Sequence, residues 1–104
     1  MSVGNFFEGL RVIDFTSNAA GPIATMHLAD FGAEVIKIEK PQVGDDTRSF
    51  PPMLDGIGVP FFWFNRGKKS VVLDVAEPEG RDLAKKLIDT ADIVVESFNT
   101  LPPD

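Results

Sequence analysis

The feature that most constrains this chain is an alternation of short apolar runs with amphipathic segments. Residues 10–15 are rich in branched apolar side chains, which is typical of a buried strand. Gly21 and Pro22 then open a helix, because proline suits the first helical turn, and Gly32 suits its end. Residues 35–38 form a second apolar run. This part of the chain therefore predicts a strand, a helix and a strand in succession.

A second unit of the same kind follows a long connection. Residues 42–60 are rich in proline and glycine, which predicts an irregular loop, and an aromatic segment with a possible helical turn comes next at residues 61–64. Residues 70–75 are predicted as a third strand. A helix starts at residues 77–79, and residues 93–95 form a fourth strand.

The order of elements predicts an α/β fold of the Rossmann-like kind, with a mostly parallel sheet flanked by helices. Strands that alternate with helices favour a parallel sheet, and apolar strands fit a sheet covered on both faces. The second helix carries its apolar residues at helical spacing: Leu83, Ala84, Leu87, Ile88 and Ala91. Since only two clear helices are visible, one face is thinly covered, and we expect the chain to pack against further polypeptide or another copy of itself.

Composition excludes several functional classes. The 104 residues include 16 acidic and 10 basic ones, a net charge of −6, which argues against a nucleic-acid-binding surface. The absence of cysteine excludes disulfides and a thiolate nucleophile. No apolar stretch reaches the length of a membrane span, so we expect a cytoplasmic protein without a membrane partner.

The turn after the first strand, residues 16–22, is the best candidate for a ligand site. In open α/β sheets ligands lie beyond the carboxyl ends of the strands, where a following helix presents free N–H groups. The turn lacks a GxGxxG pattern, which disfavours a nicotinamide or flavin dinucleotide. An ordinary strand-to-helix turn is the alternative interpretation.

Single polar residues favour structural interpretations. Asp14, inside an apolar strand, is expected to accept hydrogen bonds from a neighbouring loop rather than to act in catalysis. His27 has no second histidine or cysteine to share a metal, so a surface or packing role is expected. Asp45 and Asp46 are expected in a solvated turn rather than at a metal.

Two further groups keep both interpretations open. The aromatic segment at residues 61–64 could stack on a purine, but aromatic residues at this density are more often core or interface anchors. Lys37, Lys40, Lys68 and Lys69 could contact phosphates, but lysines that flank strands are usually only solvated.

Seven short motifs in a fixed order carry a family resemblance that runs from residue 8 to about residue 98. They are Gly9-Leu10-Arg11-Val12-Ile13-Asp14-Phe15, Ala20-Gly21-Pro22, Leu28-Ala29-Asp30-Phe31-Gly32-Ala33-Glu34-Val35-Ile36-Lys37-Ile38-Glu39-Lys40-Pro41, Gly44-Asp45-Asp46-Thr47-Arg48, Asn65-Arg66-Gly67-Lys68-Lys69-Ser70-Val71, Pro78-Glu79-Gly80 and Ala91-Asp92-Ile93-Val94-Val95-Glu96-Ser97-Phe98. In this order and spacing they resemble the N-terminal segment of the class III CoA-transferases, the family of formyl-CoA transferase and carnitine CoA-transferase.

The resemblance implies a reaction and an assembly. The family moves CoA between carboxylic acids through an aspartyl-CoA intermediate, in which a carboxylate is the nucleophile. Its members are homodimers of interlocked chains, each with a Rossmann-like large domain and a smaller one. Residues 1–104 would be the N-terminal part of the large domain, incomplete relative to the family. No permanently bound cofactor is implied, and CoA is a substrate.

The resemblance also carries CoA-contacting positions over to this sequence. They are Asn18, Ala19, Ala20, Lys40, Leu73, Asp74, Val75, Ala76, Ser97, Phe98 and Asn99. Some family members have glutamine where this chain has Ala19, so one polar contact is missing. Lys40 stands where many members have an arginine for the nucleotide phosphates, which keeps the charge but loses the bidentate geometry.

The chain departs from the family after Phe98, where the usual basic residue, proline and glycine are replaced. The family's nucleophilic aspartate has no counterpart among these residues, since Asp104 lies far too early. We therefore expect a fragment of a CoA-transferase that is inactive alone. The alternative is a stand-alone, truncated, non-catalytic module that binds CoA or assembles as a homo-oligomer. The resemblance does not identify the acyl donor or acceptor.

Overall fold

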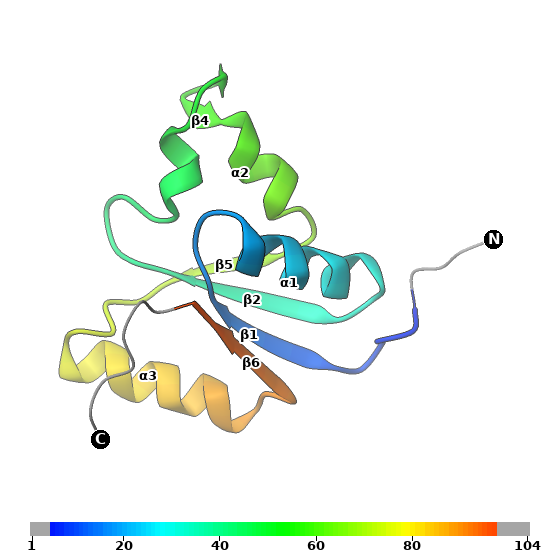
Figure 1. The fold of residues 1–104 in the computed structure, drawn as a ribbon. Helices are drawn as coiled ribbons and strands as arrows, with labels where there is room; N and C mark the ends of the chain where they lie inside the picture. The colour runs from blue at the N-terminus through cyan, green and yellow to red at the C-terminus, as the bar shows by residue number, and fades with distance from the viewer. Residues whose placement is uncertain (1–4, 98–104) are drawn as a thin grey trace.

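A parallel four-stranded sheet lies at the centre of the computed structural model, which describes residues 5–97 (Figure 1). Its strands are β1 (Arg11–Phe15), β2 (Glu34–Glu39), β5 (Lys69–Val72) and β6 (Ile93–Glu96), in the order β5-β2-β1-β6. Every neighbouring pair is parallel. The predicted α/β class and parallel sheet are confirmed.

Helices cover both faces of this sheet. α1 (Ala20–Asp30) lies on one face and α3 (Pro78–Asp89) on the other (Figure 1). Side chains of a strand alternate between the two faces. Val12 and Val35 belong to the core cluster that packs against α1, whereas Ile13, Ile36 and Ile38 belong to the cluster that packs against α3.

The apolar stripe predicted on α3 is only partly buried. Ala84 is buried and Leu87 packs on the sheet, as expected. Leu83 and Ile88, in contrast, are 49% and 37% exposed, because only the centre of the stripe faces the sheet. The sequence thus predicted the helical spacing of the stripe, but not how much of it is buried.

The long connection between β2 and β5 has more structure than the sequence predicts. It contains a 3-10 turn η1 (Asp46–Ser49), a hairpin of β3 (Met53–Leu54) and β4 (Ile57–Gly58), and the helix α2 (Val59–Phe64). Positive φ angles of 50° at Asp55 and 80° at Gly56 make the tight turn of the hairpin. The prediction of an irregular loop missed this hairpin, since its strands are only two residues long.

A glycine fixes the hairpin against the 3-10 turn. A Cβ atom on Gly58 would lie 2.2 Å from the carbonyl oxygen of Thr47 and 2.4 Å from that of Phe50. Only glycine therefore allows this close approach. As a result, the connection folds back as a compact arm beyond the carboxyl ends of β1 and β2 (Figure 1).

Candidate functional site

A pocket of about 350 Å³ lies at the carboxyl ends of the sheet strands, where the sequence predicts a ligand site. Each strand end and the connection after β2 contribute to it. Its lining consists of Phe15, Thr16, Ser17, Lys37, Ile38, Glu39, Lys40, Gly44, Asp45, Leu73, Asp74, Val75, Ala76 and Ser97. Apolar and charged groups thus meet in one cavity, as in many small-molecule sites.

Six of the eleven predicted CoA positions line this pocket: Lys40, Leu73, Asp74, Val75, Ala76 and Ser97. Asn18, Ala19 and Ala20 lie in the adjacent turn but not in the lining. Phe98 and Asn99 lie outside the described residues. Thr16 and Ser17 belong to the turn that the sequence predicts as a ligand site, and Lys37 was a candidate for phosphates. The lining residues that the sequence did not suggest are Phe15, Ile38, Glu39, Gly44 and Asp45, which end β1 and β2 or follow β2.

The segment after β5 lines the pocket because the strand is shorter than predicted. β5 ends at Val72, so residues 73–75 are not strand as predicted, although the Leu73 amide still donates to the Glu39 carbonyl at 3.0 Å. Gly80 in α3 packs directly on this segment, since a Cβ there would lie 2.0 Å from the Asp74 carbonyl oxygen. The helix start therefore shapes one wall of the pocket.

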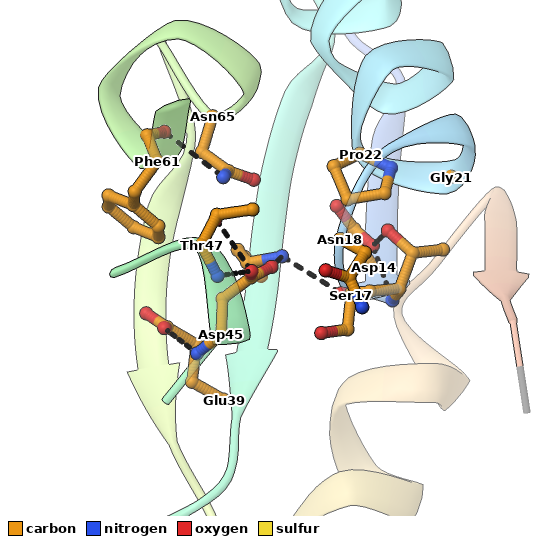
Figure 2. A network of polar contacts seen from close by, with 12 residues as sticks. Asp14, Ser17, Asn18, Gly21, Pro22, Glu39, Asp45, Thr47, Phe61 and Asn65 are labelled. Carbon is orange, nitrogen blue, oxygen red and sulfur yellow. Dashed lines mark hydrogen bonds and ion pairs between the residues drawn. The ribbon is translucent and has the colours of Figure 1, made fainter. Parts of the chain in front are cut away.

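Asp14 is fully buried next to the pocket and accepts hydrogen bonds from three sides (Figure 2). Its Oδ1 accepts from the amide of Thr16 at 2.7 Å and from the Thr16 hydroxyl, and its Oδ2 accepts from the Thr25 hydroxyl at 2.7 Å. Burial raises the pKa of Asp14, but these hydrogen bonds and the Lys68 ammonium lower it by more. The pKa of Asp14 therefore lies below its ordinary value. The predicted structural role of Asp14 agrees with this arrangement.

Lys68, 54 positions further along the chain, supplies the counter-charge of Asp14. Its Nζ lies 3.0 Å from Asp14 Oδ2, and it also donates to the Pro22 carbonyl at 3.0 Å and to Asn65 Oδ1 at 2.8 Å. Its side chain is 2% exposed, and this burial lowers the pKa of Lys68, against the raising influence of Asp14. The expectation that Lys68 is solvated is wrong, because it holds α1 and the end of α2 together.

A second buried ion pair joins β2 to the connection that follows it. Lys37 Nζ lies 2.8 Å from Asp45 Oδ2 and donates to the Thr16 carbonyl at 2.8 Å, and both charged side chains are 1% exposed. Asp45 Oδ1 accepts from the amide and hydroxyl of Thr47 (Figure 2). Burial raises the pKa of Asp45, yet Lys37 and Thr47 bring it below its ordinary value.

These contacts correct two expectations. Lys37 and Asp45 are not solvated, because together they tie the first turn to the connection after β2. Within a buried strand, a lysine flanked by apolar neighbours was a signal that the residue needs an internal partner.

Glu39 forms the third charged contact of this edge. Its two carboxylate oxygens accept from Arg48 Nε and Nη2 at 2.7 and 2.8 Å, and Oε1 also accepts from the Asp45 amide. Ser70 donates its hydroxyl to Oε2. Burial raises the pKa of Glu39, but these hydrogen bonds lower it from 4.5 to about 2. The Arg48 guanidinium in turn stacks 3.8 Å from the ring centre of Phe61, which anchors α2.

Some aromatic side chains of α2 pack against the protein, and others are exposed. Phe61 contacts Arg48, as an anchor should, whereas Phe62 and Trp63 are 46% and 61% exposed. None of the segment lines the pocket, so a purine stacked there would lie outside it.

Residues 5–97 contain neither a cluster of metal-ligating side chains nor a helix that could cross a membrane. No group of three histidine, cysteine, aspartate or glutamate side chains in this range is arranged to hold a metal, and His27 is exposed. In the same range, no helix has the length and apolar character needed to cross a bilayer.

Comparison with known proteins extends this picture. The family model of CoA-transferase family III matches residues 7–102. The chain is 46% identical over 92 residues to succinyl-CoA:glutarate CoA-transferase of Mus musculus, covering 88% of this chain and 21% of that protein. It is 42% identical over 92 residues to formyl-CoA:oxalate CoA-transferase of Rhodopseudomonas palustris, covering 88% and 22%. The chain thus spans about a fifth of the length of the curated relatives it matches.

Solved structures agree with the fold. A CAIB/BAIF family protein from Brucella suis superimposes with a TM-score of 0.85 at 39% identity, over 91% of this chain and 26% of that one. Rv3272 from Mycobacterium tuberculosis gives a TM-score of 0.82 at 43% identity, with the same coverage. The family model covers nearly the whole sequence, and the resemblance stated from the seven motifs is confirmed. This chain belongs to CoA-transferase family III.

Proposed function

We propose that this chain supplies part of the CoA site of an enzyme that transfers CoA between small carboxylic acids. One observation carries the proposal. Lys40, residues 73–76 and Ser97 come from three separate segments, and all of them line the same pocket at the carboxyl edge of the sheet.

The chemistry of the lining suits the nucleotide end of CoA. Lys40 is 60% exposed at the pocket and can place its ammonium against a phosphate as a point charge. Leu73, Val75 and Ala76 offer apolar side chains on which an adenine ring can pack. The guanidinium of Arg81 donates to the carbonyls of Val75 and Ala76 at 3.4 and 3.1 Å, which holds this wall in shape.

The proposed reaction places the chemistry on a residue outside this segment. In it, an aspartate carboxylate attacks the thioester of an acyl-CoA, which gives a mixed anhydride and frees the CoA thiolate. The thiolate then attacks the aspartyl carbonyl, which forms an aspartyl-CoA thioester and releases the donor acid. The acceptor carboxylate reacts with this thioester by the same two steps in reverse, which gives the new acyl-CoA and restores the aspartate. The residues described here would bind and orient CoA, and they would not form or break its bonds. A cytoplasmic homodimer belongs to the same proposal.

Isothermal titration with CoA tests the binding step. We expect micromolar binding by the purified protein and a roughly tenfold loss of affinity in Lys40→Ala, because one charge-assisted phosphate contact disappears. Lys86→Ala is the matched control, since it removes an exposed lysine from α3 that does not line the pocket. Absence of heat at millimolar CoA, or an equal loss in both variants, would contradict the proposal.

A further inference from the structure

We infer that Asp46 sets the affinity of this pocket for phosphate-bearing ligands, by acting as an internal anion that the ligand must displace. The inference rests on the proposed function, because it concerns two of the CoA-contacting positions named above. It adds a residue that the family resemblance did not assign to the site.

The geometry places the carboxylate of Asp46 between two donors. Its Oδ1 lies 3.5 Å from Lys40 Nζ, and its Oδ2 accepts from Asn18 Nδ2 at 3.3 Å. Lys40 directly follows β2, and Asn18 belongs to the turn after β1, with a positive φ of 73°. One carboxylate therefore bridges two segments, after β1 and after β2, whose neighbouring residues line the pocket.

The backbone that carries this carboxylate is held in place. Asp46 is the first residue of η1, directly after Asp45, whose side chain is buried against Lys37 and caps the turn through the Thr47 amide. Ser49 donates its hydroxyl to the Asp46 carbonyl at 3.0 Å. The carboxylate is thus presented from a fixed turn, although its side chain is 50% exposed.

The negative charge of Asp46 should weaken the binding of a phosphate at Lys40. A phosphate at Lys40 would meet the negative charge of Asp46 at short range, and it would have to replace the carboxylate at the same ammonium. Removing that charge should tighten the binding of CoA by about two- to tenfold, a range that fits an exposed and solvent-screened pair. A ligand fragment without phosphate should gain nothing.

Titration of Asp46→Asn tests this directly, because asparagine keeps the size and removes the charge. The binding of CoA and of pantetheine, which lacks the nucleotide and its phosphates, is measured for this variant, for the wild type and for Asp89→Asn. Asp89 is exposed at the last turn of α3, so its variant makes the same change in net charge away from the pocket.

The expected result is tighter CoA binding in Asp46→Asn alone, with pantetheine unchanged. Unchanged or weaker CoA binding in Asp46→Asn would overturn the inference while leaving the proposed function intact, provided that the wild type binds CoA. Equal tightening in Asp89→Asn would also overturn it, since net charge would then be the cause. Failure of the wild type to bind CoA would overturn the proposed function, and the inference with it.

Discussion

Replacing Glu39 by glutamine should remove a large share of the pH dependence of stability. The native structure holds the pKa of Glu39 at about 2, against an ordinary value of 4.5, although the side chain is only 2% exposed. A difference of this size corresponds to about 3 kcal/mol of folding free energy at neutral pH. Because the folded pKa is depressed, this contribution is fully present above about pH 5 and is lost as the pH falls toward 2.

Chemical denaturation at several pH values measures the effect. The free energy of unfolding of wild type and Glu39→Gln should differ by about 3 kcal/mol at pH 7, and the difference should shrink steadily between pH 5 and pH 2. Asp14 and Asp45 also titrate at low pH, but they are common to both proteins and cancel in the difference. Glu8→Gln, an exposed carboxylate, should show neither effect. A difference that stays constant with pH would refute the reasoning.

Two other substitutions test the scaffold around the site. Lys68→Met should cost about 3–5 kcal/mol in denaturant unfolding, because Asp14 is then buried without its counter-charge, and Asp14→Asn in the same chain should recover part of the loss. If Lys68→Met unfolds like the wild type, the pair is not a structural element. Gly80→Ala should lower both the melting temperature and the affinity for CoA, because the new methyl group would displace the Asp74 carbonyl. Gly56→Ala has open space at its Cβ but strains the hairpin turn at a φ of 80°, so it should lower the melting temperature and leave CoA binding unchanged. Equal losses of affinity in the two variants would contradict this account.

The sequence predicted the scaffold well because the scaffold depends on periodicity. Residues 10–15 and 35–38 form apolar runs too short for helices, and they became the two central strands. Gly21 and Pro22 lie in the first turn of α1, as predicted, and Pro78 begins α3. These features are local, so a single sequence is enough to detect them.

Long-range pairing was not predictable in the same way. Lys68 and Asp14 are 54 positions apart, and no local pattern indicates that they meet. The hairpin of β3 and β4 depends on its close packing against η1, which a sequence pattern does not show. The pocket was located by the general rule for parallel sheets, and six of its lining residues came from the family resemblance.

On the face of the sheet that α1 covers, the side chains of the two central strands change from apolar to charged toward the carboxyl ends. This change explains why the pocket lies at that end of the sheet. On β1 the alternate positions Val12 and Asp14 pass from apolar to charged, and on β2 Val35 is followed at the same spacing by Lys37 and Glu39. The apolar part holds α1, and the charged part requires internal partners.

Those internal partners hold the lining of the pocket in place. Lys37 pairs with Asp45, and Glu39 pairs with Arg48, so each buried charge that β2 presents at this edge is neutralised within the protein. The contact between Lys40 and Asp46 is exposed and longer than the contacts in these pairs, so it is weak and an anion can replace it at low cost. Rigidity of this edge therefore comes from the buried pairs, while the inferred tuning of phosphate affinity belongs to the exposed pair.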